Sequence, residues 1–577
     1  MSRFPHVRWI LACSLLAAFL LLVHSYTHGT TLEQGWEKAT QLRYHYESQG
    51  TRFMPAAMLQ ALRTPAGAPF MDPSNMRRFG FIYDQDHERG TYNTYGWPIG
   101  LAIDRDKRTG IAMAGFTCAA CHTSQIMYRG TDILIDGAPA NIDVAAFRKA
   151  LAEAVITTGK VPAARERFEK EAVELGFPSA LITRSFDALF ETMVNGAKTP
   201  PDYVVASTPS GPGRLDALNA IATAVFSTNL GVPQNAKKGD APVVFPYLWD
   251  IWRFDWVQYN ASVRQPMDRN IGEALGVGAE TNFIDRATGA TKAEPERWQT
   301  SIRVQSLYWM EQTLSKLQPP PWPQAVLGNI DTDRAARGKI LFETNCASCH
   351  AIQKIAGTTP VEWHVSVIPL SKIGTDPNQA VDYAKHTFDA TKLGLGNAVH
   401  TAVGLAYVVE HVKHQAYVDA GIPKSEWPEY DGFGRTADAF PAPCGYKARP
   451  LIGVWATGPF LHNGSVPTIY DLLSDTRPAA FWFGSRELDP IKLGFAQVEG
   501  TTRFDASLPG NSNAGHWFTN DRTRPGRIGR AFTQDEKYAI IEYLKSATES
   551  NYPQRTISKV PPLPCQSDPN WATNSAQ

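Results

Sequence analysis

Two short cysteine–histidine motifs constrain this chain more than any other feature of its sequence. Both have the pattern C-x-x-C-H, as Cys-Ala-Ala-Cys-His at 118–122 and Cys-Ala-Ser-Cys-His at 346–350. This spacing is typical of c-type haem attachment, in which the two thiols bind the porphyrin and the adjacent histidine ligates the iron. A redox dithiol would need a strand–helix setting, and a zinc site would need further ligands at short spacing; neither is visible. We therefore predict two covalent haem c groups, held by Cys118, Cys121, His122, Cys346, Cys349 and His350.

Composition indicates a large ordered protein without a nucleic-acid partner. Of the 577 residues, 43% are apolar and 19% are charged, a charged fraction below the usual ~25%. The length suffices for several domains and a large core. Basic and acidic residues number 56 each, so the formal net charge is zero. Neither a basic nucleic-acid-binding surface nor an acidic tail is indicated.

The N-terminal segment predicts export. Arg3 and Arg8 precede an uncharged apolar run from Trp9 to Val23, which is the pattern of a secretory signal. Because the run is shorter than the ~20 residues of a comfortable membrane span and no clear cleavage site follows, residues 1–28 are either a signal peptide or an uncleaved anchor. Both place the rest of the chain in the periplasm or outside the cell, free or held at the inner membrane. In such an oxidising compartment, two remaining cysteines are candidates for a disulfide, Cys444 and Cys565.

Helical patterns surround both motifs. Residues 143–198 are predicted to be helices that begin at the N-cap Asp143, and another helix over 332–344 leads into the second motif. Thr533 with Glu536 has the capping-box spacing at the start of the last helix.

The fold class predicted is mainly α with extensive irregular loops, arranged as two cytochrome c-like haem domains. The Pro-rich stretch at 318–323 cannot lie inside a helix, so a domain boundary is placed there. The expected parts are an N-terminal haem c domain at 29–318, a C-terminal cytochrome c domain at 324–550, and a Pro/Ser-rich tail at 551–577 that is a strap or disordered.

The sixth ligand of each iron decides whether a haem only carries electrons or also performs chemistry. After His122 there is no histidine until His350, so the first iron is either open or weakly occupied, or closed by a more distant side chain. The candidates for closing it are Met127, Met193, Met267, Met310, His45 and His87. Because no methionine follows Met310, the downstream candidates for the second iron are His364, His386, His400, His411, His414, His462 and His516.

Three further segments carry a family resemblance. Phe-Leu-His-Asn-Gly-Ser-Val-Pro-Thr at 460–468 resembles a segment of the bacterial di-haem cytochrome c peroxidase superfamily. The segments 256–262 and 511–516 are similar to its rubber oxygenase branch. The resemblance spans about residues 90 to 548.

This resemblance implies roles for individual residues. The N-terminal haem would bind oxygen with His122 as its proximal ligand, and the second haem would be bis-His, with His350 proximal and His516 distal. His462 is the alternative distal ligand, or it lines the second haem. The methionine-free second half departs from typical di-haem peroxidases, whose C-terminal haem usually has a methionine ligand, and this puts ordinary peroxidase activity in doubt.

The predicted function is that of an exported di-haem c-type oxidoreductase that activates oxygen or peroxide at the first haem, with electron transfer through the second. Its partners would be a redox protein or small-molecule electron donor, and oxygen, peroxide or an apolar organic substrate. The aromatic-rich stretch 245–260 is expected to form an apolar distal cover.

The named distal-pocket candidates are Phe254, Trp256 and Ile271. Four tryptophans near the haems either relay electrons or pack in the core, namely Trp249, Trp252, Trp256 and Trp455. The alternative function is a non-enzymatic periplasmic electron carrier in which both irons are six-coordinate.

Overall fold

The computed structural model describes residues 30–84, 90–198, 207–435, 440–499, 501–565 and 571. The predicted leader, His87 and most of the tail beyond Cys565 lie outside the described residues. Helix accounts for 39% of the residues and strand for 16%, so the fold is mixed, with many small sheets. These sheets join segments that are distant in the sequence, and they occupy part of what was predicted to be irregular loop.

Two three-stranded sheets hold the first cysteine motif. One has the order β2-β4-β3 and the other β1-β6-β5. The motif forms the one-turn helix α5 (Cys118–His122) directly between β4 and β5. The strands are β1 (Thr30–Thr31), β2 (Met54–Pro55), β3 (Leu101–Arg105), β4 (Ala112–Phe116), β5 (Thr123–Tyr128) and β6 (Thr131–Asp136).

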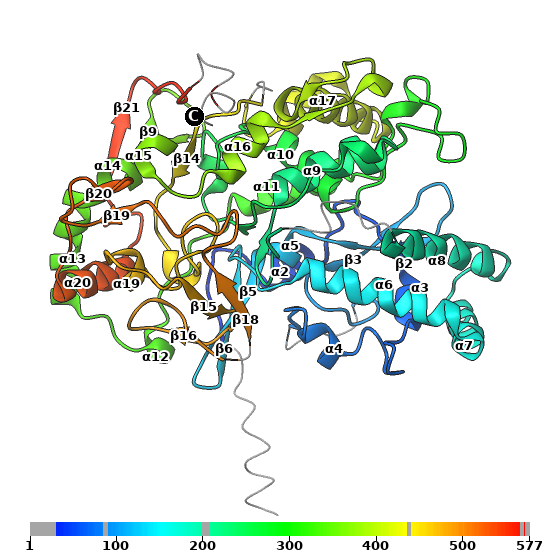
Figure 1. The fold of residues 1–577 in the computed structure, drawn as a ribbon, viewed down its shortest axis with the longest axis horizontal. Coiled ribbons are helices and arrows are strands. Elements are labelled where there is room, and N and C mark those ends of the chain that lie inside the picture. The colour runs from blue at the N-terminus through cyan, green and yellow to red at the C-terminus, as the bar shows by residue number, and fades with distance from the viewer. Residues whose placement is uncertain are drawn as a thin grey trace, which may run out of the picture.

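The predicted helices at 143–198 are confirmed as α6 (Val144–Lys160), α7 (Pro162–Glu174) and α8 (Ile182–Lys198). The Asp143 carboxylate accepts a hydrogen bond from the Ala146 amide at 2.9 Å and so caps α6. These helices pack against one another beside the sheet β2-β4-β3 at the lower right of Figure 1.

A second helical layer combines the two halves of the chain. Helices of the first half share one apolar core with helices of the second half. The halves therefore interleave across residues 318–323, which form neither helix nor strand; the domain boundary there stays a prediction. The helices of this layer are α9 (Ala217–Thr223), α10 (Pro266–Val277), α11 (Val304–Leu314), α16 (Asn378–Lys385) and α17 (Thr401–Asp419).

The second motif follows a close helix pair. The predicted helix is confirmed as α13 (Thr332–Asn345), which leads into α14 (Ala347–His350) and packs on α20 (Gln534–Ser546). At the crossing, a Cβ on Gly338 would lie 1.8 Å from the Ala539 carbonyl oxygen, so the close approach requires glycine there. The predicted capping box at the start of α20 is also present.

The described part of the tail is a strap. Strand β21 (Gln554–Ile557) pairs in parallel with β9 (Ile352–Ile355), directly after the second motif. Cys444 and Cys565 form a disulfide, as predicted, and this bond is consistent with export.

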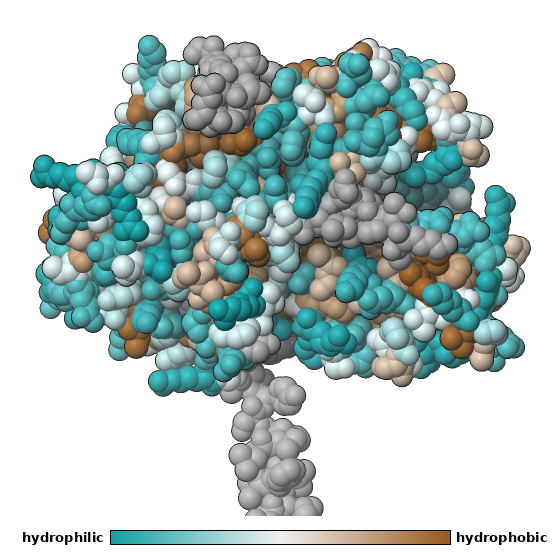
Figure 2. Space-filling model, viewed as in Figure 1, coloured by the Kyte–Doolittle hydropathy of each residue, from teal (hydrophilic) through white to brown (hydrophobic). Residues whose placement is uncertain are grey.

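Hydrophilic residues cover most of the face in Figure 2, with hydrophobic residues scattered between them. Among the described residues no helix is long and apolar enough to cross a membrane.

Shorter elements connect these layers. The remaining α-helices are α2 (Lys38–Tyr46), α3 (Ala56–Ala61), α4 (Pro73–Arg77), α12 (Gln324–Leu327), α15 (Leu370–Ile373), α18 (Trp427–Asp431) and α19 (Ile469–Leu472).

The remaining strands form short pairs, β7–β8, β11–β14, β12–β13, β15–β18, β16–β17 and β19–β20, and β10 extends the sheet of β9. Their bounds are β7 (Arg214–Leu215), β8 (Val243–Val244), β10 (Trp363–His364), β11 (Ser366–Pro369), β12 (Thr387–Phe388), β13 (Val399–His400), β14 (Gly445–Ala448), β15 (Ala480–Phe483), β16 (Leu488–Asp489), β17 (Gly494–Phe495), β18 (Thr502–Asp505), β19 (Trp517–Phe518) and β20 (Arg527–Gly529).

Candidate functional site

The first motif presents two thiols and one oriented imidazole. In α5 the two alanines are buried, whereas Cys118, Cys121 and His122 are half-buried, and neither thiol forms a disulfide. His122 Nδ1 lies 2.8 Å from the Pro246 carbonyl oxygen, and a carbonyl can only accept, so Nδ1 carries the proton. This hydrogen bond leaves Nε2 free to ligate a metal. Burial lowers the pKa of His122 to about 4, so the ring is neutral, as ligation requires.

The second motif repeats this arrangement. His350 Nδ1 lies 2.8 Å from the Arg449 carbonyl oxygen, which again leaves Nε2 free. Burial lowers the pKa of His350. Cys346 and Cys349 are unpaired and half-buried. Both motifs therefore offer the thiols and the neutral imidazole that a covalently bound haem needs.

A second imidazole faces His350. The ring of His516 lies with its centroid 6.3 Å from that of His350, at an interplanar angle of 62°. Metal–nitrogen bonds of about 2.0–2.1 Å on both sides of one ion fit between two rings at this separation. Burial lowers the pKa of His516 to about 3, so this ring is neutral too.

The loop that carries His516 is tightly held. His516 adopts a positive φ of 51°, and its amide donates to the Ile373 carbonyl at 2.8 Å. The Arg477 guanidinium donates to the carbonyl oxygens of Asn513, Gly515 and His516 at 2.6–3.0 Å. The ring position is therefore set by contacts from outside its own segment.

The other candidate histidines have different neighbours. The His462 ring stacks on Tyr446, with centroids 4.0 Å apart, and burial lowers the pKa of His462 to about 3. His364 Nδ1 lies 2.7 Å from Asp255 Oδ2. The rest bond carbonyls, lie near a carboxylate or stack on an aromatic ring, as found for His386, His400, His411 and His414.

A cavity opens beside Cys118 and His122. Its wall comes from the segment after Phe245, from one face of α10 and from one face of α11. The lining residues are Cys118, His122, Pro246, Leu248, Ile251, Val257, Gln258, Arg269, Asn270, Glu273, Met310, Glu311, Leu314 and Lys447.

Part of this wall is a buried polar cluster. Arg269 forms an ion pair with Glu311, and Asn270 donates to Glu311 Oε1 at 3.0 Å. Glu311 Oε2 is buried without a hydrogen-bond partner. Gln258 donates to Glu273 at 3.0 Å, and burial raises the pKa of Glu273. Burial also lowers the pKa of Lys447 well below its ordinary value.

These residues differ from the predicted distal pocket. Phe254, Trp256 and Ile271 do not line this cavity, although Val257 and Asn270, the neighbours of Trp256 and Ile271 in the sequence, do. The stretch 245–260 contributes aliphatic and polar groups, because two of its aromatic rings point elsewhere. Tyr247 stacks on Trp249 at 4.5 Å, and the Trp249 indole donates to the Ile452 carbonyl at 2.9 Å.

The polar cluster was missed because it is spread over two helices 40 residues apart. The available signal was weak, because Arg269 and Glu273 share a short helix that also carries Asp268 and Asn270. Of the proposed thioethers, Met310 lines the cavity, whereas Met193 and Met267 pack in other cores. His45 Nε2 is bound to Asp136 Oδ1 at 2.7 Å.

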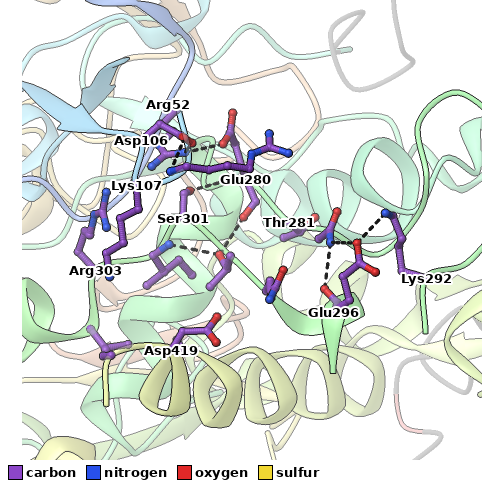
Figure 3. A pocket seen from close by; sticks show the side chains of 18 of the residues that line it. Arg52, Asp106, Lys107, Glu280, Thr281, Lys292, Glu296, Ser301, Arg303 and Asp419 are labelled. Carbon is purple, nitrogen blue, oxygen red and sulfur yellow. Dashed lines mark hydrogen bonds and ion pairs between the residues drawn. The ribbon is translucent and has the colours of Figure 1, made fainter. Parts of the chain in front are cut away.

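A separate cleft of about 960 Å³ lies at the N-terminal end of α11 (Figure 3). Its charged side chains pair with one another. Arg52 contacts Asp106 at 2.6 Å and Glu280 at 2.7 Å, and Lys292 contacts Glu296 at 2.7 Å. The cleft contains neither motif, so we take the buried cavity at His122 as the candidate reactive site.

Comparison with known proteins supports a cytochrome assignment. Residues 445–482, which include Arg449 and the segment 460–468, match a family described as RoxA-like, cytochrome c-like. The uncharacterized protein y4iJ of Sinorhizobium fredii is 36% identical over 90% of this chain and 93% of its own length. The uncharacterized protein y4iM of the same organism is 27% identical over 64% of this chain and 78% of its own length.

Proposed function

Because this chain belongs to the same family as y4iJ of Sinorhizobium fredii and carries two oriented C-x-x-C-H motifs, we propose that it is an exported di-haem c-type oxidoreductase that activates oxygen or peroxide beside His122. The observation that carries the proposal is an asymmetry. His350 is faced by a second imidazole, whereas His122 is faced by a cavity with a polar wall. The first side thus suits chemistry and the second suits electron transfer.

The geometry supports a specific set of haem ligands. Cys118 and Cys121 would form the thioether bonds of the first haem, with His122 as its proximal ligand. Cys346 and Cys349 would form the thioether bonds of the second haem. His350 would be its proximal ligand and His516 its distal ligand. When bound, haem supplies electron transfer where both axial positions are filled and oxygen or peroxide chemistry where one is open.

The polar cluster favours peroxide over an apolar organic substrate. Cleavage of a peroxide bond requires a proton to move from one oxygen to the other, and a buried carboxyl group is suited to this transfer. Glu311 Oε2 has a free acceptor site, while Arg269 and Asn270 fix its other oxygen. Glu273, whose pKa is raised, is a nearby proton reservoir. An apolar substrate would gain nothing from these groups.

Haem staining of a denaturing gel and cyanide titration test the assignment. Colour that survives denaturation is expected at both motifs, since thioether bonds persist. We expect one cyanide bound per two haems, lost in His122→Ala and retained in His516→Phe. Glu311→Gln should keep cyanide stoichiometry but slow the reaction with hydrogen peroxide by about 10²–10⁴-fold. Unchanged kinetics in Glu311→Gln would remove the residue from the mechanism.

The second candidate function is electron carriage, and Met310 is the observation that favours it. Its side chain lines the cavity with His122 and is a thioether. If Met310 fills the sixth position, the wild-type protein binds no cyanide and Met310→Leu does. Cyanide binding by the wild type would exclude this ligation.

A further inference from the structure

We propose that Arg449 is a shared tuning residue, whose guanidinium lies between the two proximal histidine–carbonyl pairs and raises the reduction potentials of both haems together. This inference rests on the haem attachment proposed above. Arg449 lies outside both C-x-x-C-H motifs and links the two segments that bind their histidines.

The two proximal carbonyls belong to two short segments that lie side by side. His122 Nδ1 is bound by the Pro246 carbonyl, and His350 Nδ1 by the Arg449 carbonyl, each at 2.8 Å. Pro246 is followed by Tyr247, and it is Tyr247 that Arg449 contacts. One short chain of neighbours therefore connects the two proximal imidazoles.

Several contacts make the two segments one unit. Arg449 Nη1 donates to the Tyr247 carbonyl at 3.2 Å, and the guanidinium carbon lies 3.4 Å from the Tyr247 ring centroid. The Tyr247 hydroxyl donates to the Pro450 carbonyl. Trp249 stacks on Tyr247 at 4.5 Å and donates to the Ile452 carbonyl. This stack fixes the guanidinium in a planar, half-buried position.

The Arg449 charge acts on both sites with the same sign. Its guanidinium bonds the carbonyl of Tyr247, which follows the residue that binds His122, and its own carbonyl binds His350. Among the described residues, Arg449 has no carboxylate within ion-pair distance. A ferric haem carries one more positive charge than a ferrous haem, so the same cation favours the ferrous state at both sites.

The test is a spectroelectrochemical titration of the holoprotein, in which the two haems are followed by their separate absorbance bands. Arg449→Gln should lower both midpoint potentials, each by at least the ~59 mV that a tenfold change in a one-electron equilibrium represents. Arg449→Lys keeps the charge and should stay closer to the wild type at both haems. All variants keep the backbone carbonyl that binds His350, so the comparison isolates the side chain.

Arg486→Gln is the matched control. This arginine is half-buried like Arg449, but its charged neighbours are Asp132 and Arg77. It should leave both potentials unchanged. If Arg449→Gln accumulates no holoprotein, Tyr247→Leu removes the ring that fixes the guanidinium and should change both potentials.

The outcomes separate this inference from the function it rests on. A wild-type protein without covalent haem at both motifs would refute the proposed function. Two haems with potentials that Arg449→Gln leaves unchanged would refute only the tuning role. A shift confined to one haem would show that Arg449 serves that haem alone and would equally overturn the shared role.

Discussion

Two histidines of the second half, His462 and His516, differ in role because the side chains around them differ. His462 is buried and His516 is half-buried, burial lowers the pKa of both, and both follow the second motif by more than 100 residues. The ring of His462 is held between Tyr446 and Tyr259, with centroids 4.0 and 6.1 Å away. The ring of His516 faces His350. Only the second arrangement places an imidazole opposite the histidine of a C-x-x-C-H motif.

His516→Ala should therefore convert the low-spin second haem to high spin and leave the first haem unchanged, because only the second iron loses its distal ligand. His462→Ala is the matched control and should keep the low-spin signal. Absorbance and electron paramagnetic resonance spectra of both variants measure the effect. A full low-spin signal in His516→Ala would move the ligand to another side chain.

At the scale of elements, the helix pair beside the second motif depends on one glycine. In Gly338→Ala the added Cβ meets the backbone of α20, which cannot move aside, so α13 and α20 must separate. Overpacking of this kind costs about 1–3 kcal/mol in the free energy of unfolding. Denaturant titration measures this loss of stability. The absorbance bands of the second haem should change at a lower denaturant concentration in the variant than in the wild type.

Gly196→Ala supplies the control for this prediction. Gly196 lies in α8, and its added Cβ would meet nothing within 4 Å. This change should stabilise the protein by up to about 1 kcal/mol, because alanine is the better helix former. Equal destabilisation by both changes would mean that helix crossing is not the cause.

A group of carboxyl groups lies where α16 meets the segments around 216 and 240. Burial raises the pKa of Asp382, and Asp240 raises it further. Burial also raises the pKa of Asp216, to about 6. The ordinary pKa of an aspartate in the unfolded chain is ~3.9. These groups therefore hold protons in the folded state at pH values where the unfolded chain has released them.

The consequence is a stability that falls as pH rises. The folded protein binds more protons than the unfolded chain between about pH 4 and the raised pKa values, so the free energy of unfolding decreases across that window. Asp382→Asn should flatten this dependence and raise the thermal midpoint at the alkaline end. Thermal scans from acid to mildly alkaline pH measure it, with exposed Asp419→Asn as the control. If the thermal midpoint of Asp382→Asn changes with pH in the same way as that of the wild type, Asp382 is not a source of the pH dependence.

At the scale of the whole molecule, the two halves are joined by shared cores and by the tail. Helices α9, α10 and α11 pack with α16 and α17, and one further core contains both Ile126 and Ile540. The disulfide between Cys444 and Cys565 spans 121 residues and ties the strap to the second half. The molecule should therefore unfold with strong coupling between the halves.

Removal of this disulfide in Cys444→Ser/Cys565→Ser should cost about 2–4 kcal/mol in the free energy of unfolding. The bond limits the unfolded chain, which regains freedom when the bond is absent. Denaturant titration of oxidised and reduced protein measures the difference. Reduced wild type should match the double variant; a large remaining difference would show that the substitutions themselves disturb the fold.

The sequence alone determined the features that depend on residues a few positions apart. The C-x-x-C-H motifs, the Asp143 cap and the Thr533–Glu536 capping box are of this kind, because thioether attachment and helix capping join groups within one turn of chain. Cysteine arithmetic also left Cys444 and Cys565 as candidates for a disulfide, and the structure shows that they form one. These predictions need no knowledge of the path between distant segments.

Only the tertiary structure decided what surrounds the two motifs. Glu311 meets Arg269 from another helix, and Arg449 meets Tyr247 from a segment about 200 residues away. No local spacing encodes such contacts, because they arise when separate apolar faces are buried together. The same burial left the Phe245 ring 6.3 Å from the His122 ring but stacked Tyr247 and Trp249 on each other, and charged side chains line the cavity instead.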